Sequence, residues 1–75
     1  SCNSLETITI PKSVNSIEYN AFGNCNNLTR ITIPDTVTFM QTHVFDGSNN
    51  LTIHCKYNSY AHKYAIEKKI PVQLI

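Results

Sequence analysis

Two short segments of the chain alternate apolar and polar residues in the same order. Residues 7–10 read Thr-Ile-Thr-Ile, and residues 30–33 read Arg-Ile-Thr-Ile. An apolar side chain at every second position is typical of a strand with one buried face, so we expect the isoleucines to point into a core and the polar residues outward. Pro11 and Pro34 follow the two segments. Because a proline has no backbone N–H, each should end its strand at the same point.

The spacing of the apolar residues changes after each proline. Apolar residues then fall every three or four positions, at Val14, Ile17 and Ala21. This spacing predicts one or two tight helical or 3₁₀ turns that form a wall opposite the strands. Stretches rich in Gly, Asn and Asp at residues 23–27 and 46–50 then predict turns into the next strand.

The whole pattern recurs after 23 residues. The matched positions are Cys2 and Cys25, Leu5 and Leu28, Ile8 and Ile31, Ile10 and Ile33, Val14 and Val37, and Phe22 and Phe45. A fixed period of about 20–50 residues is the signature of a solenoid, in which each unit buries its apolar face against the next. We therefore expect repeat 1 at residues 1–23, repeat 2 at 24–47 and a partial repeat 3 at 48–55.

Residues 56–75 break the repeat and predict a C-terminal cap. Asn58 or Ser59 can cap a helix, which Ile70-Pro71 would end. The residues that share the apolar face of this helix are Ala61, Tyr64 and Ala65. Residues 71–75 predict a final strand or extended segment over the last turn.

Repeat 1 has no comparable cap before it. We expect that end of the core to expose Leu5, Ile8 and Ile10, and exposed apolar strand edges tend to pair. The chain is therefore predicted to be one domain at the C-terminal end of a longer array, completed by upstream repeats or by self-association.

Residues 2–45, CNSLETITIPKSVNSIEYNAFGNCNNLTRITIPDTVTFMQTHVF, resemble the BspA-like leucine-rich repeat, whose units read roughly C-x-x-L-x-x-I-x-I-P-x-x-V-x-x-I-x-x-x-A-F. Residues 58–75 are similar to the terminal cap of that family. The resemblance implies a mainly β, α/β fold: a right-handed leucine-rich-repeat solenoid of about three coils, with a short parallel sheet, a convex wall of turns or 3₁₀ helix and a C-terminal capping helix. It also implies a part of a larger surface or secreted protein that acts in adhesion and protein binding. Met40, Val44 and Ser48 depart from the consensus.

The charge and hydropathy of the chain exclude two classes of function. Six Lys and Arg stand against five Asp and Glu, for a net charge of +1, so the chain lacks the basic balance of a nucleic-acid binder. No apolar run approaches the roughly 20 residues of a membrane-spanning helix. We expect neither a nucleic-acid partner nor a membrane span.

The residues that carry chemistry are dispersed. His43, His54 and His62 are predicted on the convex wall, the strand face and the cap helix, so they do not converge as metal ligands must. The acidic residues fall one per element, at Glu6, Glu18, Asp35, Asp46 and Glu67. No Ser or Cys lies in a nucleophile motif. We expect no enzymatic activity, no cofactor and no metal.

The three cysteines are interpreted as packing residues. Cys2 and Cys25 share one repeat position, which brings a disulfide within reach, but a reduced thiol is also a good small buried group. Cys55 takes an inward strand position without a partner. The cysteines therefore do not distinguish an oxidising from a reducing compartment.

The outward face of the strands is the predicted binding surface. The repeat register stacks Thr7, Arg30 and Thr52 in one row. A second row contains Thr9, Thr32 and His54. Contiguous sheet faces of this kind bind extended partners in solenoid proteins.

These observations favour a non-catalytic, adhesion-type binding module in a cell-surface or secreted protein, located outside the cell. Its partner would be a protein or glycan on a host or neighbouring cell surface. Two alternatives stay open: a structural spacer and end cap, or a targeting module of a larger wall-associated enzyme.

Overall fold

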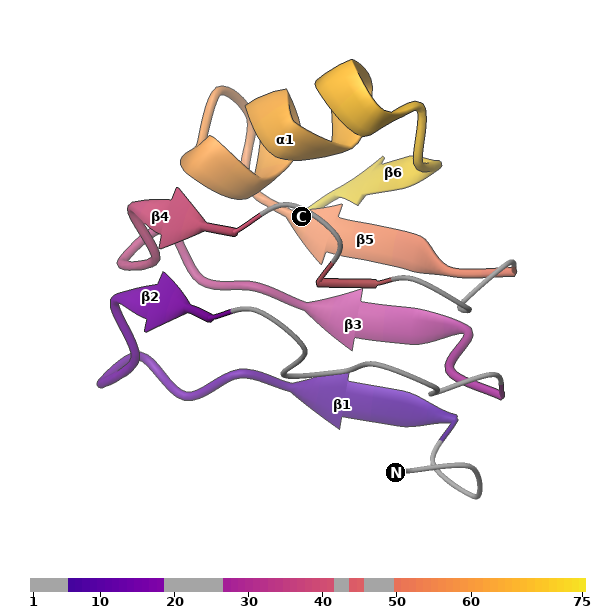
Figure 1. Ribbon diagram of the computed structural model, residues 1–75, viewed down its shortest axis with the longest axis horizontal. Helices are drawn as coiled ribbons and strands as arrows, with labels where there is room; N and C mark the ends of the chain where they lie inside the picture. The colour runs from indigo at the N-terminus through magenta and orange to yellow at the C-terminus, as the bar shows by residue number, and fades with distance from the viewer. Residues whose placement is uncertain (1–5, 19–26, 42–43, 46–49) are drawn as a thin grey trace.

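A four-stranded parallel sheet forms one side of the protein (Figure 1). The computed structural model describes residues 6–18, 27–41, 44–45 and 50–75. The sheet contains β1 (Thr7–Thr9), β3 (Arg30–Thr32), β5 (Thr52–Cys55) and β6 (Val72–Leu74), in the order β1-β3-β5-β6. The first three strands come from successive repeats, so the predicted short parallel sheet is confirmed.

The strands pair in the register that the repeat predicts. Ile8 lies opposite Ile31, and Ile31 lies opposite Ile53, so equivalent residues of successive repeats stack across the sheet. The ladder continues one residue past the strands: the N–H of Ile10 donates to the Thr32 oxygen and that of Ile33 to the His54 oxygen, both at 2.9 Å. The next residue in each repeat is a proline, which has no N–H to donate. Because alternate N–H groups point to the same neighbour, the N atom of Pro34 faces β1, so Pro34 ends the ladder between β1 and β3 where the sequence predicts.

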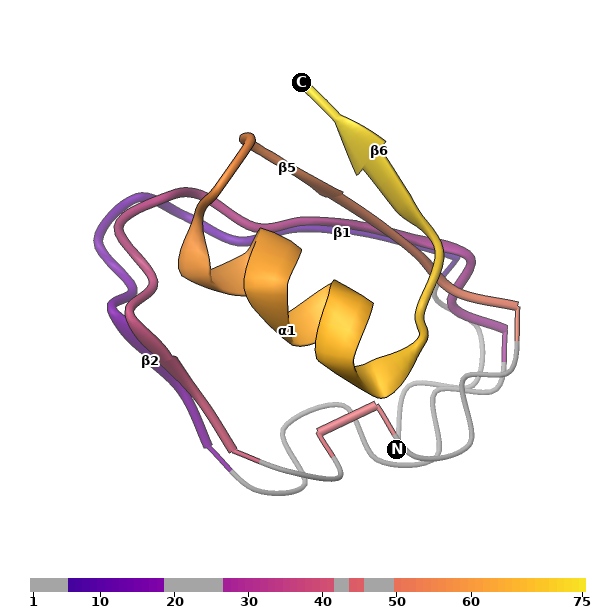
Figure 2. The same cartoon turned by 90° about the horizontal axis from the view of Figure 1, so that it is seen from above.

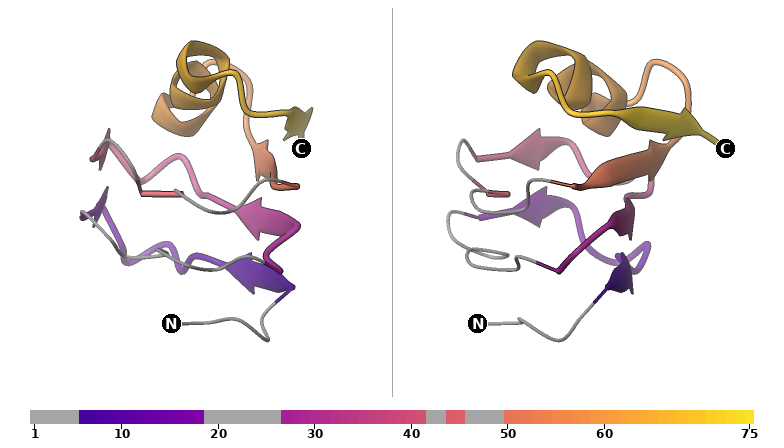
Figure 3. Two further views of the ribbon diagram at one scale, coloured as in Figure 1. Left: turned by 45° about the vertical axis from the view of Figure 1, so that its right-hand side comes forward. Right: turned by 90° about the vertical axis from the view of Figure 1, so that its right-hand side faces the viewer.

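The wall opposite the sheet begins as extended chain. β2 (Ser16–Ile17) and β4 (Phe39–Met40) pair in parallel as a two-stranded sheet (Figure 3). The prediction of helical or 3₁₀ turns is wrong for these residues. The N–H groups of Thr38 and Gln41 donate to the oxygens of Asn15 and Ile17, at 2.9 and 3.0 Å, so the backbone groups bond between repeats rather than within one.

The apolar spacing that suggested a helix has another cause. The N–H of Val14 donates to the Pro11 oxygen at 3.1 Å, and that of Val37 donates to the Pro34 oxygen at 3.2 Å. These bonds close β-turns at residues 11–14 and 34–37, and the extended segments that follow bring Ile17 and Met40 into the core three residues after Val14 and Val37. Ala21 and Phe22, which completed the predicted pattern, lie outside the described residues.

One helix, α1 (Tyr60–Lys68), follows β5 and confirms the predicted capping helix. The Ser59 hydroxyl accepts from the His62 N–H at 3.2 Å, which satisfies one of the unpaired donors of the first turn. Lys69 adopts the left-handed conformation (φ 61°) at the end of the helix, and the Ile70 N–H donates to the Ala65 oxygen at 2.8 Å. Seen from above, the helix lies over the space between the sheet and the wall (Figure 2).

The helix carries two tyrosine hydroxyls to the free edge of the wall. Tyr60 donates to the Met40 oxygen at 3.4 Å, and Tyr64 donates to the Gln41 oxygen at 3.1 Å. Both acceptors lie on or next to β4, on the side of the wall that no further strand covers in the described part of the chain. Side-chain donors of the helix thus bond carbonyls where the backbone of another wall strand would otherwise pair.

The core fills the space between the sheet, the wall and the helix. Its largest fully buried side chains are Leu28, Ile31, Ile33, Val37, Val44, Ile53 and Cys55. Ala61, Tyr64 and Ala65 of α1 close it from the side of the cap, as predicted from their shared face. Tyr64 meets the Phe45 ring edge-on, with 6.3 Å between the ring centroids. At the β1 side the predicted exposure of Ile10 is wrong, because its side chain is buried in the core; Ile8 is partly buried, and Leu5 lies outside the described residues.

The final strand is also confirmed. β6 runs parallel to β5, and α1 supplies the crossover that a parallel pair requires. The Ile53 N–H donates to the Pro71 oxygen and the Ile75 N–H to the Cys55 oxygen, both at 2.9 Å. The cap therefore extends the sheet as well as covering the core.

Replacing Tyr64 with phenylalanine tests the hydroxyl contact of the cap. The Tyr64→Phe change keeps the ring in the core but leaves the Gln41 oxygen without this donor, so the free energy of unfolding should fall by about 1 kcal/mol. Urea unfolding followed by circular dichroism measures this loss. Tyr57→Phe is the matched control, because the Tyr57 side chain is 75% exposed. Equal stability of both variants and the parent would contradict a bonding role for the cap tyrosine.

Candidate functional site

The six residues predicted to form the binding surface lie in two rows on the outward face of the sheet. Thr7 lies opposite Arg30, which lies opposite Thr52. Thr9, Thr32 and His54 line up in the same way one step along the strands. All six are exposed or partly exposed, whereas the alternating isoleucines of β3 and β5 are fully buried. The placement and the neighbours predicted for these residues are therefore confirmed.

β6 adds a residue that the sequence reasoning missed. Gln73 lies opposite His54, so the second row reads Thr9, Thr32, His54, Gln73. We call this the threonine row. The 23-residue repeat could not predict the place of Gln73 in this row, because β6 follows α1 and lies outside the repeat. The apolar Val72 before it, which faces inward, was the available signal.

A third outward row follows from the same register, two residues further along the strands. It contains Pro11, Pro34, Lys56 and Ile75, and we call it the proline row. The bond from the Ile75 N–H to the Cys55 oxygen holds the last member in place. The prolines that end the strands therefore also give the outward face an apolar border.

A groove of about 440 Å³ lies between the threonine row and the proline row. Its lining residues are Thr9, Ile10, Pro11, Lys12, Thr32, Ile33, Pro34, Asp35, Lys56 and Ile75. A smaller hollow of about 190 Å³ lies nearer the start of the strands, around Thr7 and Arg30. The outward face is therefore contoured, and the larger of these two hollows lies beside the prolines.

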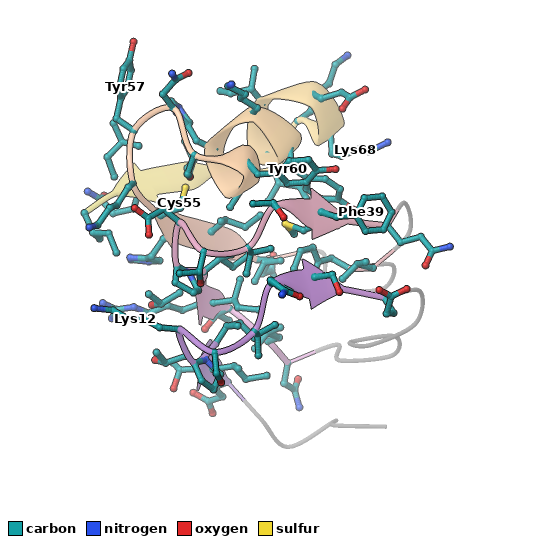
Figure 4. All side chains as sticks on the ribbon, turned by 90° about the vertical axis from the view of Figure 1, so that its left-hand side faces the viewer. Lys12, Phe39, Cys55, Tyr57, Tyr60 and Lys68 are labelled. Carbon is teal, nitrogen blue, oxygen red and sulfur yellow. The ribbon has the colours of Figure 1, made fainter. Side chains whose placement is uncertain are left out.

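A second cleft, of about 500 Å³, opens where α1 begins. Tyr57, Tyr60 and Lys63 line it, together with Asp35 and Lys56, which also border the groove. Tyr57 points away from the body of the protein (Figure 4), and its ring lies 5.4 Å from that of His62, centroid to centroid. His62 Nδ1 accepts from the Asn58 N–H at 2.8 Å, which fixes the loop before the helix.

The candidate metal ligands and acids do not gather anywhere in the residues described. His54 lies on β5 and His62 on α1, and no group of three His, Cys, Asp or Glu side chains could hold a metal ion there. His43, Asp46, Cys2 and Cys25 are outside those residues. No helix among residues 6–18, 27–41, 44–45 and 50–75 is long and apolar enough to cross a membrane.

The comparison with protein families gives one match, which spans nearly the whole chain. A family model described as "BspA type Leucine rich repeat region (6 copies)" matches residues 1–69. Neither the curated proteins nor the solved structures contain a match to the chain.

Cys55 lies directly behind the candidate surface, between His54 and Lys56 in sequence. Its side chain is fully buried and it forms no disulfide, so the prediction of a packing residue is confirmed at this position. Burial raises the pKa of the Cys55 thiol above its ordinary value of 9.0, and a hydrogen bond with Ser59 partly opposes this. The thiol is therefore a poor nucleophile in the folded protein.

The raised pKa predicts how stability depends on pH. In the unfolded chain the thiol ionises near its ordinary value of 9.0, but in the folded protein it holds its proton to higher pH. Cys55 thus contributes stability that is complete below that value and is lost as the pH rises through the folded pKa.

Urea unfolding of the parent and of Cys55→Ala between neutral and alkaline pH measures this contribution. The parent should lose stability relative to the variant above about pH 9. All other ionisable groups are the same in both proteins, so their contributions cancel in the difference. If the stability of the parent relative to the variant stayed constant or rose with pH, the burial of the thiol would be contradicted.

Proposed function

Because the chain belongs to the BspA-type leucine-rich-repeat family, we propose that it is a non-catalytic binding module of a cell-surface or secreted protein. Its partner is a protein or glycan on a host or neighbouring cell, and it binds on the outward face of the sheet. The proposed architecture is a right-handed solenoid of about three coils, in which strands of successive repeats lie roughly 4.8 Å apart.

The observation that carries this proposal is the contrast between two groups of threonines. The hydroxyls of Thr29, Thr36 and Thr38 donate to backbone oxygens of the preceding repeat, at 3.1, 3.2 and 3.4 Å. The side chains of Thr7, Thr9, Thr32 and Thr52 make no hydrogen bond with any other described residue. These four are therefore not needed to join the repeats, and their hydroxyls are available to a partner.

The sheet also holds these hydroxyls in fixed positions. Each side chain stands on a short strand that is bonded to its neighbour through the backbone, and the isoleucines behind β3 and β5 are fully buried. Preorganised groups lose little conformational entropy when a partner binds. Arg30 and His54 add donors to the two rows, so the surface suits a polar, hydrogen-bonding partner.

The cap favours a second function, that of a spacer and end cap. α1 closes the core and bonds the free edge of the wall through Tyr60 and Tyr64. A larger protein, including a wall-associated enzyme that this module targets, would gain solubility from such an end. In this case recognition would lie elsewhere in the parent protein.

Charge substitution in the threonine row distinguishes the two functions. The triple variant Thr9→Lys, Thr32→Lys, His54→Lys changes the outward face, and Thr38→Lys places a single lysine on the opposite wall as a control for location. The labelled proteins are screened against glycan arrays, extracellular-matrix proteins and whole cells. We expect the triple variant to lose at least about tenfold in affinity while Thr38→Lys keeps it.

Circular dichroism and urea unfolding must show that both variants still fold. A folded triple variant that binds every partner as well as the parent does would reject the outward face as the site and support the spacer function.

A further inference from the structure

The groove beside the proline row differs in character from the rest of the outward face. Pro11, Pro34 and Ile75 give it an apolar side, and Ile75 remains 63% exposed. Thr9 and Thr32 form the opposite, polar side. Its volume of about 440 Å³ falls within the range of about 300–1,000 Å³ that is common for small-molecule sites. The groove can therefore receive an inserted side chain of a partner, whereas a flat surface could only be contacted from outside.

The rim of the groove carries more positive than negative charge. Lys12 and Lys56 line it together with one acidic residue, Asp35. Lys12 extends outward from the turn after the first proline (Figure 4). None of the three forms an ion pair with another residue in the described segments. Arg30 lies on the same outward face, across the threonine row. A partner with acidic residues on both sides of its anchor would complement this rim.

We propose, resting on the binding function above, that this groove receives one apolar side chain of an acidic, extended segment of a partner protein. The apolar side made by the prolines and Ile75 contacts the anchor side chain. The free hydroxyls of Thr9 and Thr32 bond the backbone of the segment, whose polar groups are unpaired when it is extended. Lys12 and Lys56 attract the flanking carboxylates. A glycan fits this site less well, because it has no comparable apolar side chain to place against the prolines.

Peptide titration followed by NMR tests the inference on the folded chain. The probe is a synthetic peptide of alternating Glu and Ser with one central Leu. We expect it to shift the amide signals of Thr9, Ile10, Thr32 and Ile33, with an affinity that falls as salt is added. A peptide with Ser in place of the Leu removes the anchor, and one with Gln in place of Glu removes the charge. Both should bind at least about tenfold more weakly.

Two double variants with the same net change of charge provide the protein controls. Lys12→Glu with Lys56→Glu reverses the rim and should weaken peptide binding at least about tenfold. Lys68→Glu with Lys69→Glu makes the same change at the end of α1, outside the lining of the groove and of the second cleft, and should leave binding nearly unchanged. Equal weakening by both pairs, equal binding of the Leu and Ser peptides, or shifts confined to other residues would each overturn the inference.

The outcomes separate this inference from the proposed function. A partner whose binding is lost in the Thr9, Thr32, His54 triple variant but is unaffected by reversal of Lys12 and Lys56 would overturn the groove and leave the binding module intact. If a glycan were the only ligand of the outward face, the groove would likewise be overturned and the binding module kept. Peptide binding in the groove, with every cell-surface partner insensitive to the triple variant, would support the groove as a peptide site and reject the outward face as the site of those cell-surface partners.

Discussion

The parallel pairing of equivalent residues in successive repeats is the constraint on which the rest of the structure depends. Ile8, Ile31 and Ile53 lie opposite one another, and the neighbouring threonines must then share the other face. A slip of one residue would turn every threonine inward, since side chains alternate with a period of two. Pro11 and Pro34 limit such slips, because a proline cannot take the donor position that Ile10 and Ile33 now fill.

The cap solves a problem that the repeat creates. Each repeat leaves backbone groups and apolar side chains that the next one covers, so the last repeat needs a different partner. α1 covers the core with Ala61, Tyr64 and Ala65, and its tyrosine hydroxyls reach the carbonyls of the wall. β6 pairs with β5 and carries Gln73 into the threonine row. The cap therefore closes the core and also enlarges the proposed binding surface.

Those parts of the fold that follow from local chemistry or from the period were predictable from sequence. The sheet register, the Ser59 cap and the inward face of α1 needed only alternation, a repeat and a capping residue. The wall at Ser16–Ile17 was predicted wrongly, because a β-turn followed by an extended segment produces the same apolar spacing as a helical turn. Gln73 and the groove were not predictable, since both require the register of a strand that comes after a helix.

Amide hydrogen exchange at β1, measured residue by residue with NMR, tests most directly whether the isoleucines face the core. β1 pairs with β3 on one side, and in a parallel pair alternate N–H groups point to the same neighbour. The Ile10 N–H donates to the Thr32 oxygen, so the Thr9 N–H points away from β3. Slow exchange at Ile10 with fast exchange at Thr9 is the predicted result. Slow exchange at Thr9 with fast exchange at Ile10 would mean that the strand is turned over, with its threonines in the core and no polar row on the outward face.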